Sequence, residues 1–253
     1  MKNLFFPTRR LFAICAVGAL FLTTACNKLD HDDVPNTPAA ALMSFNLVPD
    51  KTGVVLAISG NVLTSVPLSY TSYTGGYQSI YAGNRTFASY GITSSDTLAS
   101  TPFNFEENKY YSAFVVGKGS AYQNVVVRDN FDSLSGSNGK AYVRYINAIP
   151  DASQPSVTIA ANGSNVVSET RAFASVSDFV EVTPGPVSIA ASNGGNINTA
   201  RTITLEAKKA YTVLLVGVPG SASVDSVQVK FITNGELSAD AQRTSAAAAR
   251  SAN

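Results

Sequence analysis

Few residues of this 253-residue chain could carry out covalent chemistry. The single histidine, His31, and both cysteines, Cys15 and Cys26, precede residue 40. The rest of the sequence therefore offers no Ser-His-Asp or Cys-His nucleophile and no Cys/His zinc site. Glu106 and Glu107 could act as the carboxylate pair of a glycosidase, but they are adjacent at the entrance of a strand, where a solvated turn explains them. The sequence predicts no catalytic residue, no metal ligand and no cofactor.

The first residues have the pattern of a secretion signal. Lys2, Arg9 and Arg10 form a basic start, and the run from Leu11 to Leu22 is wholly apolar. This run is shorter than the roughly 20 residues that a membrane-spanning helix requires. The pattern predicts a signal peptide over residues 1–25 and no permanent transmembrane helix.

Cys26 directly follows the small residues Thr24 and Ala25. This junction resembles the lipobox of bacterial lipoproteins, in which the cysteine is acylated and becomes the first residue of the mature chain. Thr23 departs from that pattern, because a large aliphatic residue usually stands three places before the cysteine. Since Cys15 is removed with the leader, Cys26 would be unpaired in an exported protein, and acylation explains it. Ordinary cleavage after Ala25, which leaves a free thiol, is the alternative.

The stretch after the cysteine is acidic and polar. Asp30, Asp32 and Asp33 lie in residues 26–39, which we expect to form a solvated tether. Acidic residues at this place resemble the signal that sends lipoproteins of Bacteroidetes-type bacteria to the outer face of the outer membrane. We therefore expect export and a lipid anchor in the outer membrane, with the cell surface and the periplasm both open. A calcium site is the competing interpretation, but no ligand loop with a central glycine follows.

The charge of the mature chain excludes one class of partner. Three of the 18 basic residues lie in the leader, so 15 remain against 17 acidic residues, a net charge of −2. No basic cluster remains. Because phosphate backbones are bound by concentrated Lys and Arg, we expect no nucleic acid partner.

The remaining chain contains two copies of one domain. "AALMSFNLVPD" (40–50) matches "AYVRYINAIPD" (141–151) at an offset of 101, and "FEENKYYSAFVVG" (105–117) matches "LEAKKAYTVLLVG" (205–217) at an offset of 100. A near-constant offset is typical of tandem repeats. The sequence predicts copy 1 over 40–128, a polar linker over 129–140, copy 2 over 141–233, and an Ala- and Ser-rich, disordered tail over 234–253.

Each copy has the pattern of strands. Short runs rich in Val, Ile, Tyr, Phe and Thr are separated by turn residues about every 8–12 positions, and no window has a sustained helical stripe. About seven strands in about 90–100 residues are typical of an antiparallel β-sandwich of immunoglobulin-like or transthyretin-like character. Tyr111 and Tyr211 open the longest apolar strand of each copy. They resemble a tyrosine corner, in which a buried ring bonds nearby backbone through its hydroxyl.

The ends of the two first strands, "NLVPD" and "NAIPD", the turns at Gly83 and Gly185, and the two Tyr-to-Gly strands resemble the domain-of-unknown-function family number 4397. The resemblance covers about residues 40–232. It implies tandem β-sandwiches in secreted proteins and lipoproteins, with no established activity. Asp50 and Asp151 close the Pro-Asp pairs, and we interpret them as turn residues, with a ligand role as the alternative.

Tyrosines supply the candidate binding residues. The first copy holds eight of the 11 tyrosines, so the shared fold does not require most of them. When "YQSIYAG" (77–83) is aligned with "FVEVTPG" (179–185), Tyr77 and Tyr81 share the solvent face of a strand, and Tyr73 lies nearby. Exposed rings can stack on sugars or anchor a protein partner. The alternative is that Tyr73, Tyr77 and Tyr81 cover the sandwich edge or pack against the neighbouring copy.

Together these observations predict a non-catalytic lipoprotein of the cell envelope that acts as a surface binding or adhesion module. Its partners would be the membrane, through the lipid anchor, and a glycan or an envelope protein. An accessory or structural subunit of an outer-membrane complex is the alternative function. A carboxylate-dependent glycan hydrolase is a remote third.

Overall fold

The computed structural model describes residues 37–93, 96–223 and 225–238. The predicted signal peptide, the lipidation site Cys26, nearly all of the acidic tether and the tail beyond Ser238 lie outside these residues. The described residues from Pro38 onward belong to one compact unit. The described part is all-β, with a single 3-10 turn at Phe131–Ser133, and none of it forms a helix that could cross a membrane.

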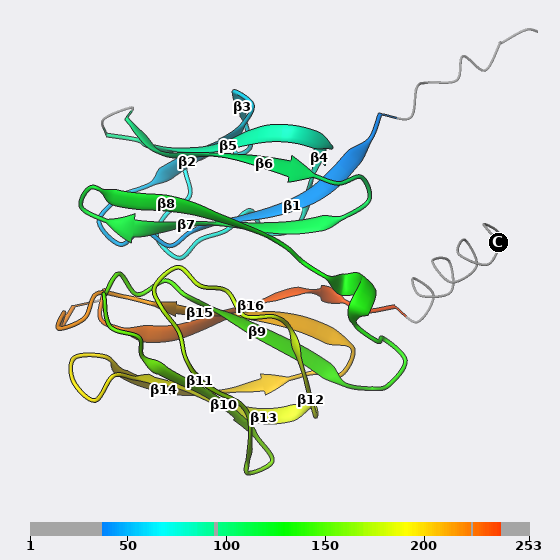
Figure 1. The fold of residues 1–253 in the computed structure, drawn as a ribbon, viewed down its shortest axis with the longest axis vertical. Helices are drawn as coiled ribbons and strands as arrows, with labels where there is room; N and C mark the ends of the chain where they lie inside the picture. The colour runs from blue at the N-terminus through cyan, green and yellow to red at the C-terminus, as the bar shows by residue number, and fades with distance from the viewer. Residues whose placement is uncertain (1–36, 94–95, 224, 239–253) are drawn as a thin grey trace, which may run out of the picture. The chain divides into compact units, whose positions relative to one another are not determined.

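Eight strands form the first copy: β1 (Ala39–Asn46), β2 (Val54–Ile58), β3 (Asn61–Val62), β4 (Gln78–Tyr81), β5 (Gly83–Gly91), β6 (Thr97–Phe105), β7 (Tyr110–Lys118) and β8 (Ala121–Arg128). They make a sandwich of two four-stranded sheets, ordered β4-β1-β7-β8 and β3-β2-β5-β6 (Figure 1). All pairings are antiparallel except that of β1 with β7.

The second copy repeats this arrangement with β9 (Ala141–Asn147), β10 (Ser156–Ala161), β11 (Ser164–Thr170), β12 (Val180–Val182), β13 (Gly185–Ser192), β14 (Asn198–Leu205), β15 (Lys209–Val216) and β16 (Gln228–Glu236). Its sheets have the orders β12-β9-β15-β16 and β11-β10-β13-β14, and β9 is parallel to β15. Each strand of copy 1 thus has a counterpart at the same place in copy 2. The repeat in the sequence is a repeat of the fold.

The number of strands per copy is eight, one more than predicted. β3, β4 and β12 contain two, four and three residues, which is too few for a clear alternating pattern. An immunoglobulin constant domain divides seven strands as ABED and CFG. Here the first strand lies beside the seventh in a four-stranded sheet, so the strand order differs from that of the immunoglobulin constant domain.

Each sandwich encloses a hydrophobic core of its own. In copy 1, Leu56, Phe87 and Phe105 are buried between the two sheets. In copy 2 the buried residues of the equivalent cluster are aliphatic apart from Tyr145 and Tyr211. β10 is buried at every second residue, as expected for a strand with one face on a core.

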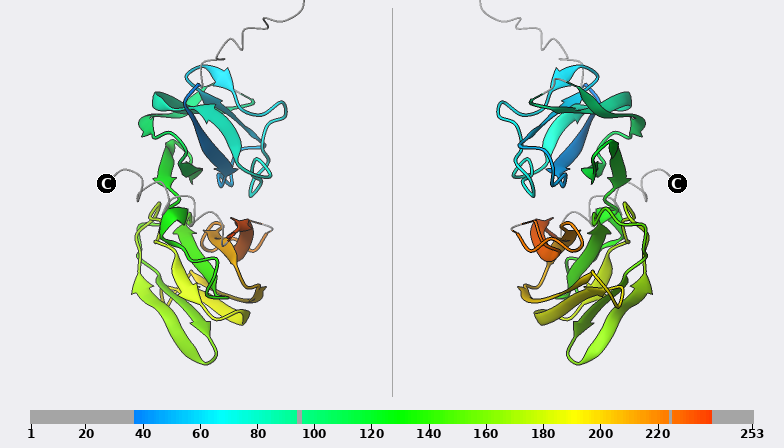
Figure 2. Two further views of the ribbon diagram at one scale, coloured as in Figure 1. Left: turned by 90° about the vertical axis from the view of Figure 1, so that its right-hand side faces the viewer. Right: turned by 90° about the vertical axis from the view of Figure 1, so that its left-hand side faces the viewer.

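A third hydrophobic cluster joins the two copies. It lies between the sheets β4-β1-β7-β8 and β12-β9-β15-β16, so the central strands of both sheets are buried on both faces (Figures 1 and 2). Burial on β7 and β9 is accordingly continuous rather than alternating. The copies therefore share buried surface. The fully buried members are Met43, Phe45, Leu47, Phe114, Val116, Ile146, Ala148, Leu214 and Val216.

The segment between the copies, residues 129–140, is anchored at three residues. Its polar composition predicted an exposed linker; Asn130, Asp132, Ser133, Ser137 and Asn138 are exposed, but Asp129, Leu134 and Gly136 are buried. Gly136 lies so close to the backbone of Leu237 that a Cβ would come within 2.5 Å of the Leu237 carbonyl oxygen. Composition did not reveal this, because it does not show which few residues of a polar segment contact a neighbouring strand.

Both expected tyrosine corners are present. The buried Tyr111 hydroxyl accepts a hydrogen bond from the backbone N–H of Glu106 at 2.8 Å. The buried Tyr211 hydroxyl accepts one from Glu206 at 3.0 Å. Each corner ties the start of a central strand to the turn before it, so it fixes where β7 and β15 begin.

Replacing a corner tyrosine by phenylalanine keeps the ring and removes this bond. We expect Tyr111→Phe and Tyr211→Phe each to lower the free energy of unfolding by about 1 kcal/mol, because a backbone N–H loses its partner. Urea unfolding followed by circular dichroism measures the change. Tyr110→Phe is the control, since Tyr110 is exposed, and it should leave the midpoint unchanged. Equal midpoints for all three variants would contradict the role of the corner.

Candidate functional site

The structure separates the three tyrosines predicted to bind a ligand. Ile80 is buried in the core of copy 1, so Tyr77 and Tyr81 do lie on the other side of this segment. Tyr81 is 63% exposed. Tyr77 is half-buried against copy 2, and Tyr73 stacks on Phe45 in the cluster between the copies. The expectation that Tyr77 and Tyr81 share a solvent-facing surface is therefore wrong, because the second copy covers Tyr77.

Tyr77 instead lines a pocket of about 360 Å³. Its ring centroid lies 5.1 Å from that of Tyr110, at the start of β7, and 5.9 Å from that of Phe131, in the 3-10 turn. Tyr110 and Phe131 are 5.3 Å apart, and all three contacts are edge to face. This geometry holds each ring in a defined orientation. The pocket is completed by Asp132, Leu134, Asn234, Gly235, Glu236, Leu237 and Ser238.

Charged groups lie at the rim of this aromatic pocket. The Asp132 carboxylate contacts the Lys109 ammonium at 2.7 Å and the Arg128 guanidinium at 3.1 Å. The hydrogen bond from Lys109 is the main reason that the pKa of Asp132 lies below its usual range, so this carboxylate is ionised at neutral pH. Glu236, at the end of β16, is exposed. The pocket therefore combines apolar ring surface with carboxylate oxygens.

A buried ion pair lies beside the pocket. Arg144 Nη1 of β9 and Asp129 Oδ1, directly after β8, are 2.6 Å apart, and their side chains are 2% and 0% exposed. Asp129 Oδ2 also accepts hydrogen bonds from Ser112 Oγ at 2.7 Å and from the Tyr77 hydroxyl. Arg144 donates to Ser112 Oγ at 2.7 Å and to Thr212 Oγ1 at 3.0 Å. These additional bonds offset the desolvation of the two charges, which can otherwise exceed their attraction.

Tyr77 connects the ion pair to the aromatic pocket. Its ring lines the pocket, while its hydroxyl donates to Asp129 and accepts a hydrogen bond from Asn234 Nδ2 at 3.2 Å. Asn234 Oδ1 in turn accepts a bond from Thr212 Oγ1 at 2.6 Å. Burial raises the pKa of the Tyr77 phenol, and the charge of Asp129 raises it further. The pocket wall and the ion pair thus form one hydrogen-bonded unit with residues from both copies.

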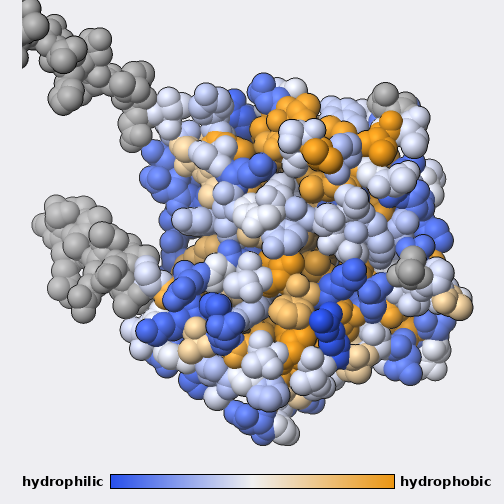
Figure 3. Space-filling model, turned by 180° about the vertical axis from the view of Figure 1, so that it is seen from behind, coloured by the Kyte–Doolittle hydropathy of each residue, from blue (hydrophilic) through white to orange (hydrophobic). Residues whose placement is uncertain are grey.

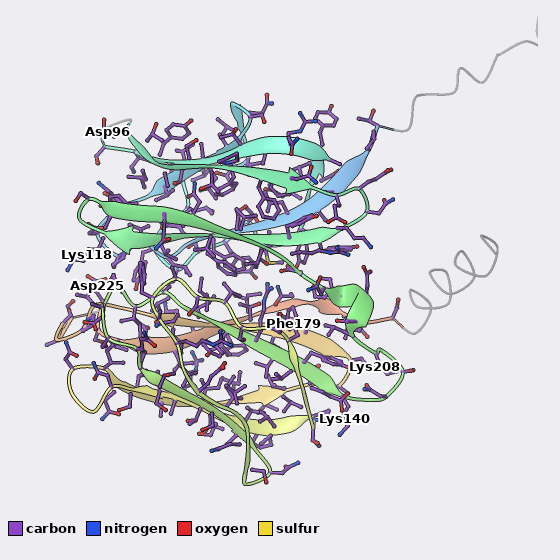
Figure 4. The ribbon with its side chains drawn as sticks, in the orientation of Figure 1. Asp96, Lys118, Lys140, Phe179, Lys208 and Asp225 are labelled. Carbon is purple, nitrogen blue, oxygen red and sulfur yellow. The ribbon has the colours of Figure 1, made fainter. Side chains whose placement is uncertain are left out.

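Phe179, labelled in Figure 4, lies against the Arg144 side of the ion pair. The Arg144 guanidinium carbon lies 4.5 Å from its ring centroid, within the range of a cation–π contact. A second pocket of about 290 Å³ begins here. Its arginines already have partners, so the aromatic pocket is the better candidate for a ligand site. The lining of the second pocket is Val127, Arg128, Asn130, Ser133, Arg144, Val176, Ser177, Asp178 and Phe179.

One of the two carboxylates considered for catalysis has structural partners. Glu106 contacts the Arg128 guanidinium at 3.3 Å and donates its backbone N–H to the tyrosine corner. Glu106 and Glu107 are both exposed. Among the described residues, no group of three or more His, Cys, Asp or Glu side chains is placed to hold a metal ion.

The two aspartates of the Pro-Asp pairs serve turns, each in its own way. Asp151 Oδ1 accepts the backbone N–H of Ser153 at 2.8 Å, the local bond expected of a turn aspartate. Asp50 Oδ2 instead accepts the backbone N–H of Gly119 at 2.7 Å and the Tyr122 hydroxyl at 2.9 Å. It therefore holds the hairpin between β7 and β8.

Tyr110, Phe131 and Asn234 belong to no sequence pattern that marks a site. One signal was available in the strands themselves: the runs at 110–117 and 141–147 are apolar almost without alternation. Such runs are typical of strands covered on both faces. They indicated that another layer covers this sheet, and so that an aromatic residue beside it would not be free.

The sequence matches the model of one protein family. That model, described as "Domain of unknown function (DUF4397)", matches residues 40–154 and again residues 141–246, so the chain is a member of this family in two copies. No curated protein matches the sequence. Among solved structures, the chain is similar to a "putative cell adhesion protein" from Bacteroides eggerthii, at 9% identity over 79% of this chain and 96% of that one. The TM-score of 0.24 is too low to support any inference from it.

The Tyr77 phenol makes stability sensitive to alkaline pH. Its pKa in the folded chain lies above the value of about 10 for an exposed tyrosine, so the unfolded chain loses this proton first as the pH rises. Its contribution to stability is therefore complete below about pH 10 and falls above it. We expect Tyr77→Phe to lessen the fall in the urea midpoint between pH 9 and pH 11. The exposed Tyr81→Phe is the control, and an unchanged slope in Tyr77→Phe would contradict the assignment.

Proposed function

We propose that this member of the DUF4397 family is a non-catalytic, lipid-anchored binding protein of the cell envelope, and that its aromatic pocket holds one sugar residue of a glycan. The observation that carries the proposal is the set of three ordered rings, Tyr77, Tyr110 and Phe131, at the mouth of a pocket with a polar rim. The proposed binding site therefore lies at the junction of the two copies, and not on the face that carries Tyr81, where the sequence predicted it.

The size and chemistry of the pocket support a sugar. A volume of about 360 Å³ lies at the lower end of the range for small-molecule pockets and suits one ring-sized group. Tyr110 is 43% exposed, so part of its ring is open to a ligand. The C–H groups of a pyranose can lie on such a ring, while Glu236 and Asp132 offer acceptors for hydroxyl groups.

An accessory subunit of an envelope complex is the second candidate, and one observation favours it. Val62, Val66 and Ile92 of copy 1 are large apolar side chains that are exposed to solvent. Figure 3 shows apolar groups among polar residues on the rear face. Scattered exposed residues of this kind are common on soluble proteins, so the pocket remains the stronger basis for a function.

Removing the Tyr110 ring tests the binding site. We expect Tyr110→Ala to weaken binding to the recognised glycan by about tenfold, because a stacked ring contributes about 1 kcal/mol or more. The chain from residue 27 onward is applied to an array of oligosaccharides ending in glucose, galactose or N-acetylglucosamine. Tyr81→Ala removes an exposed ring outside the pocket and should bind as the wild type does. Glycan binding that survives Tyr110→Ala would contradict this site, and no binding to any sugar would favour a protein partner.

Changing the cysteine tests the anchor. We expect Cys26→Ser to release the exported protein from membranes, because the thiol is the acceptor of the lipid. Fractionation of cells and mass spectrometry of the mature N-terminus measure the two parts of the claim. A variant that remains in the membrane fraction, together with a wild-type protein without acyl groups, would refute the anchor.

A further inference from the structure

The two sheets that face each other between the copies place residues from equivalent positions of the repeat at their interface. Met43 of β1 pairs with Ser112 of β7, and Arg144 of β9 pairs with Thr212 of β15. Both pairs stand at the same place in the repeat, one residue after the pairing with the corner tyrosine. Met43 is therefore the counterpart of Arg144, and Ser112 is the counterpart of Thr212.

Asp129 and Asn234 are also counterparts. Each directly follows the residue of β8 or β16 that lies opposite the corner tyrosine. Each accepts a bond from the equivalent hydroxyl: Ser112 Oγ donates to Asp129 at 2.7 Å, and Thr212 Oγ1 donates to Asn234 at 2.6 Å. The same hydrogen bond is thus made once by a carboxylate and once by an amide.

Tyr77 and Phe179 form the remaining pair. Each stands three residues before the residue of β4 or β12 that pairs with the equivalent alanine of β1 or β9. The two rings flank the ion pair, since Tyr77 bonds to Asp129 and Phe179 lies against Arg144. Each copy presents the same four positions to the other, so the interface has an approximate twofold relation, as in an isologous dimer.

Charge breaks this twofold relation. The copy 1 side supplies Met43 and Asp129, which directly follows β8. The copy 2 side supplies Arg144 and Asn234, which lies in β16, past the predicted end of copy 2 at residue 233. One of the two related positions holds the ion pair. The twofold relation assigns the Met43 thioether and the Asn234 amide to the other. All four side chains are buried, so water does not solvate a charge that a wrong pairing leaves without its partner.

We propose that Asp129 and Arg144 make the two copies select each other, so that the face of copy 1 accepts copy 2 and rejects a face like itself. Two copy 1 faces would bury two carboxylates without a cation. Two copy 2 faces would bury two guanidinium groups without an anion. A buried charge without its partner is strongly destabilising, and building such a penalty into the wrong pairing is a general route to specificity. This inference does not depend on which ligand the pocket holds.

Substitutions within the intact chain can imitate both wrong pairings, that of two copy 1 faces and that of two copy 2 faces. Arg144→Met with Asn234→Asp gives the interface the four side chains of a copy 1 pair. Met43→Arg with Asp129→Asn gives it those of a copy 2 pair. All four substitutions together move the ion pair to positions 43 and 234. Asp129→Asn with Arg144→Met removes both charges and is the neutral control.

The cleavage rate of residues 129–140 by proteinase K reports whether the copies stay together, because this segment is anchored by residues at their junction. We expect both imitations to be cleaved about tenfold faster than the wild type, since each leaves buried charges without partners. The chain with all four substitutions should return close to the wild-type rate, although it carries more changes. Circular dichroism should show folded strands throughout, because each sandwich has its own core.

Two results would overturn the proposal. Imitations that are cleaved no faster than the neutral control would mean that the charges do not select the partner. A chain with all four substitutions that is cleaved as fast as the imitations would mean that the two positions are not equivalent. If an imitation fails to fold, the chain with all four substitutions decides: a folded, resistant chain supports the proposal, and an unfolded one overturns it.

Discussion

Arg144 and Asp129 meet between two sheets whose facing surfaces are otherwise largely apolar, and their contact constrains everything built around it. Hydrophobic burial alone is not directional, so the shared cluster could stabilise several ways of placing one sandwich on the other. Hydrogen bonds to a buried charge are directional. The contact of Arg144 with Asp129 and its hydrogen bond to Ser112 cross between the copies, as does the bond from Asn234 to the Tyr77 hydroxyl, and these contacts are satisfied together in one placement of the two copies.

The aromatic pocket is a consequence of that placement. Tyr77 and Tyr110 belong to copy 1, Asn234 and Glu236 belong to copy 2, and Phe131 lies in the segment between them. Neither copy contains the pocket alone. If each copy acted by itself, the two copies would carry the same binding surface twice. Here the two copies carry different residues at equivalent positions, and the aromatic pocket therefore differs in its lining from the second pocket, which Arg128 and Arg144 line.

Local features were predictable where both partners of an interaction lie close together in the sequence. The tyrosine corners join residues five positions apart, so the Tyr at the start of an apolar strand was sufficient to predict them. The short strands β3, β4 and β12 were not predictable to the same degree, because pairing with a neighbour defines them more than their own residues do. For the same reason, the polar composition of 129–140 did not reveal that Leu134 and Gly136 are buried.

The sequence by itself determined the all-β class, the duplication and the absence of histidine and cysteine from the two copies. These properties depend on composition, periodicity and a constant offset, which need no knowledge of distant contacts. The tertiary structure alone decided that Tyr77 is covered, that Tyr110, Phe131 and Asn234 form a pocket with it, and that Arg144 finds its partner in Asp129. Each of these outcomes depends on which sheet faces which. That choice is made by side chains far apart in the sequence, whose contact exists only when both sandwiches are folded and packed together.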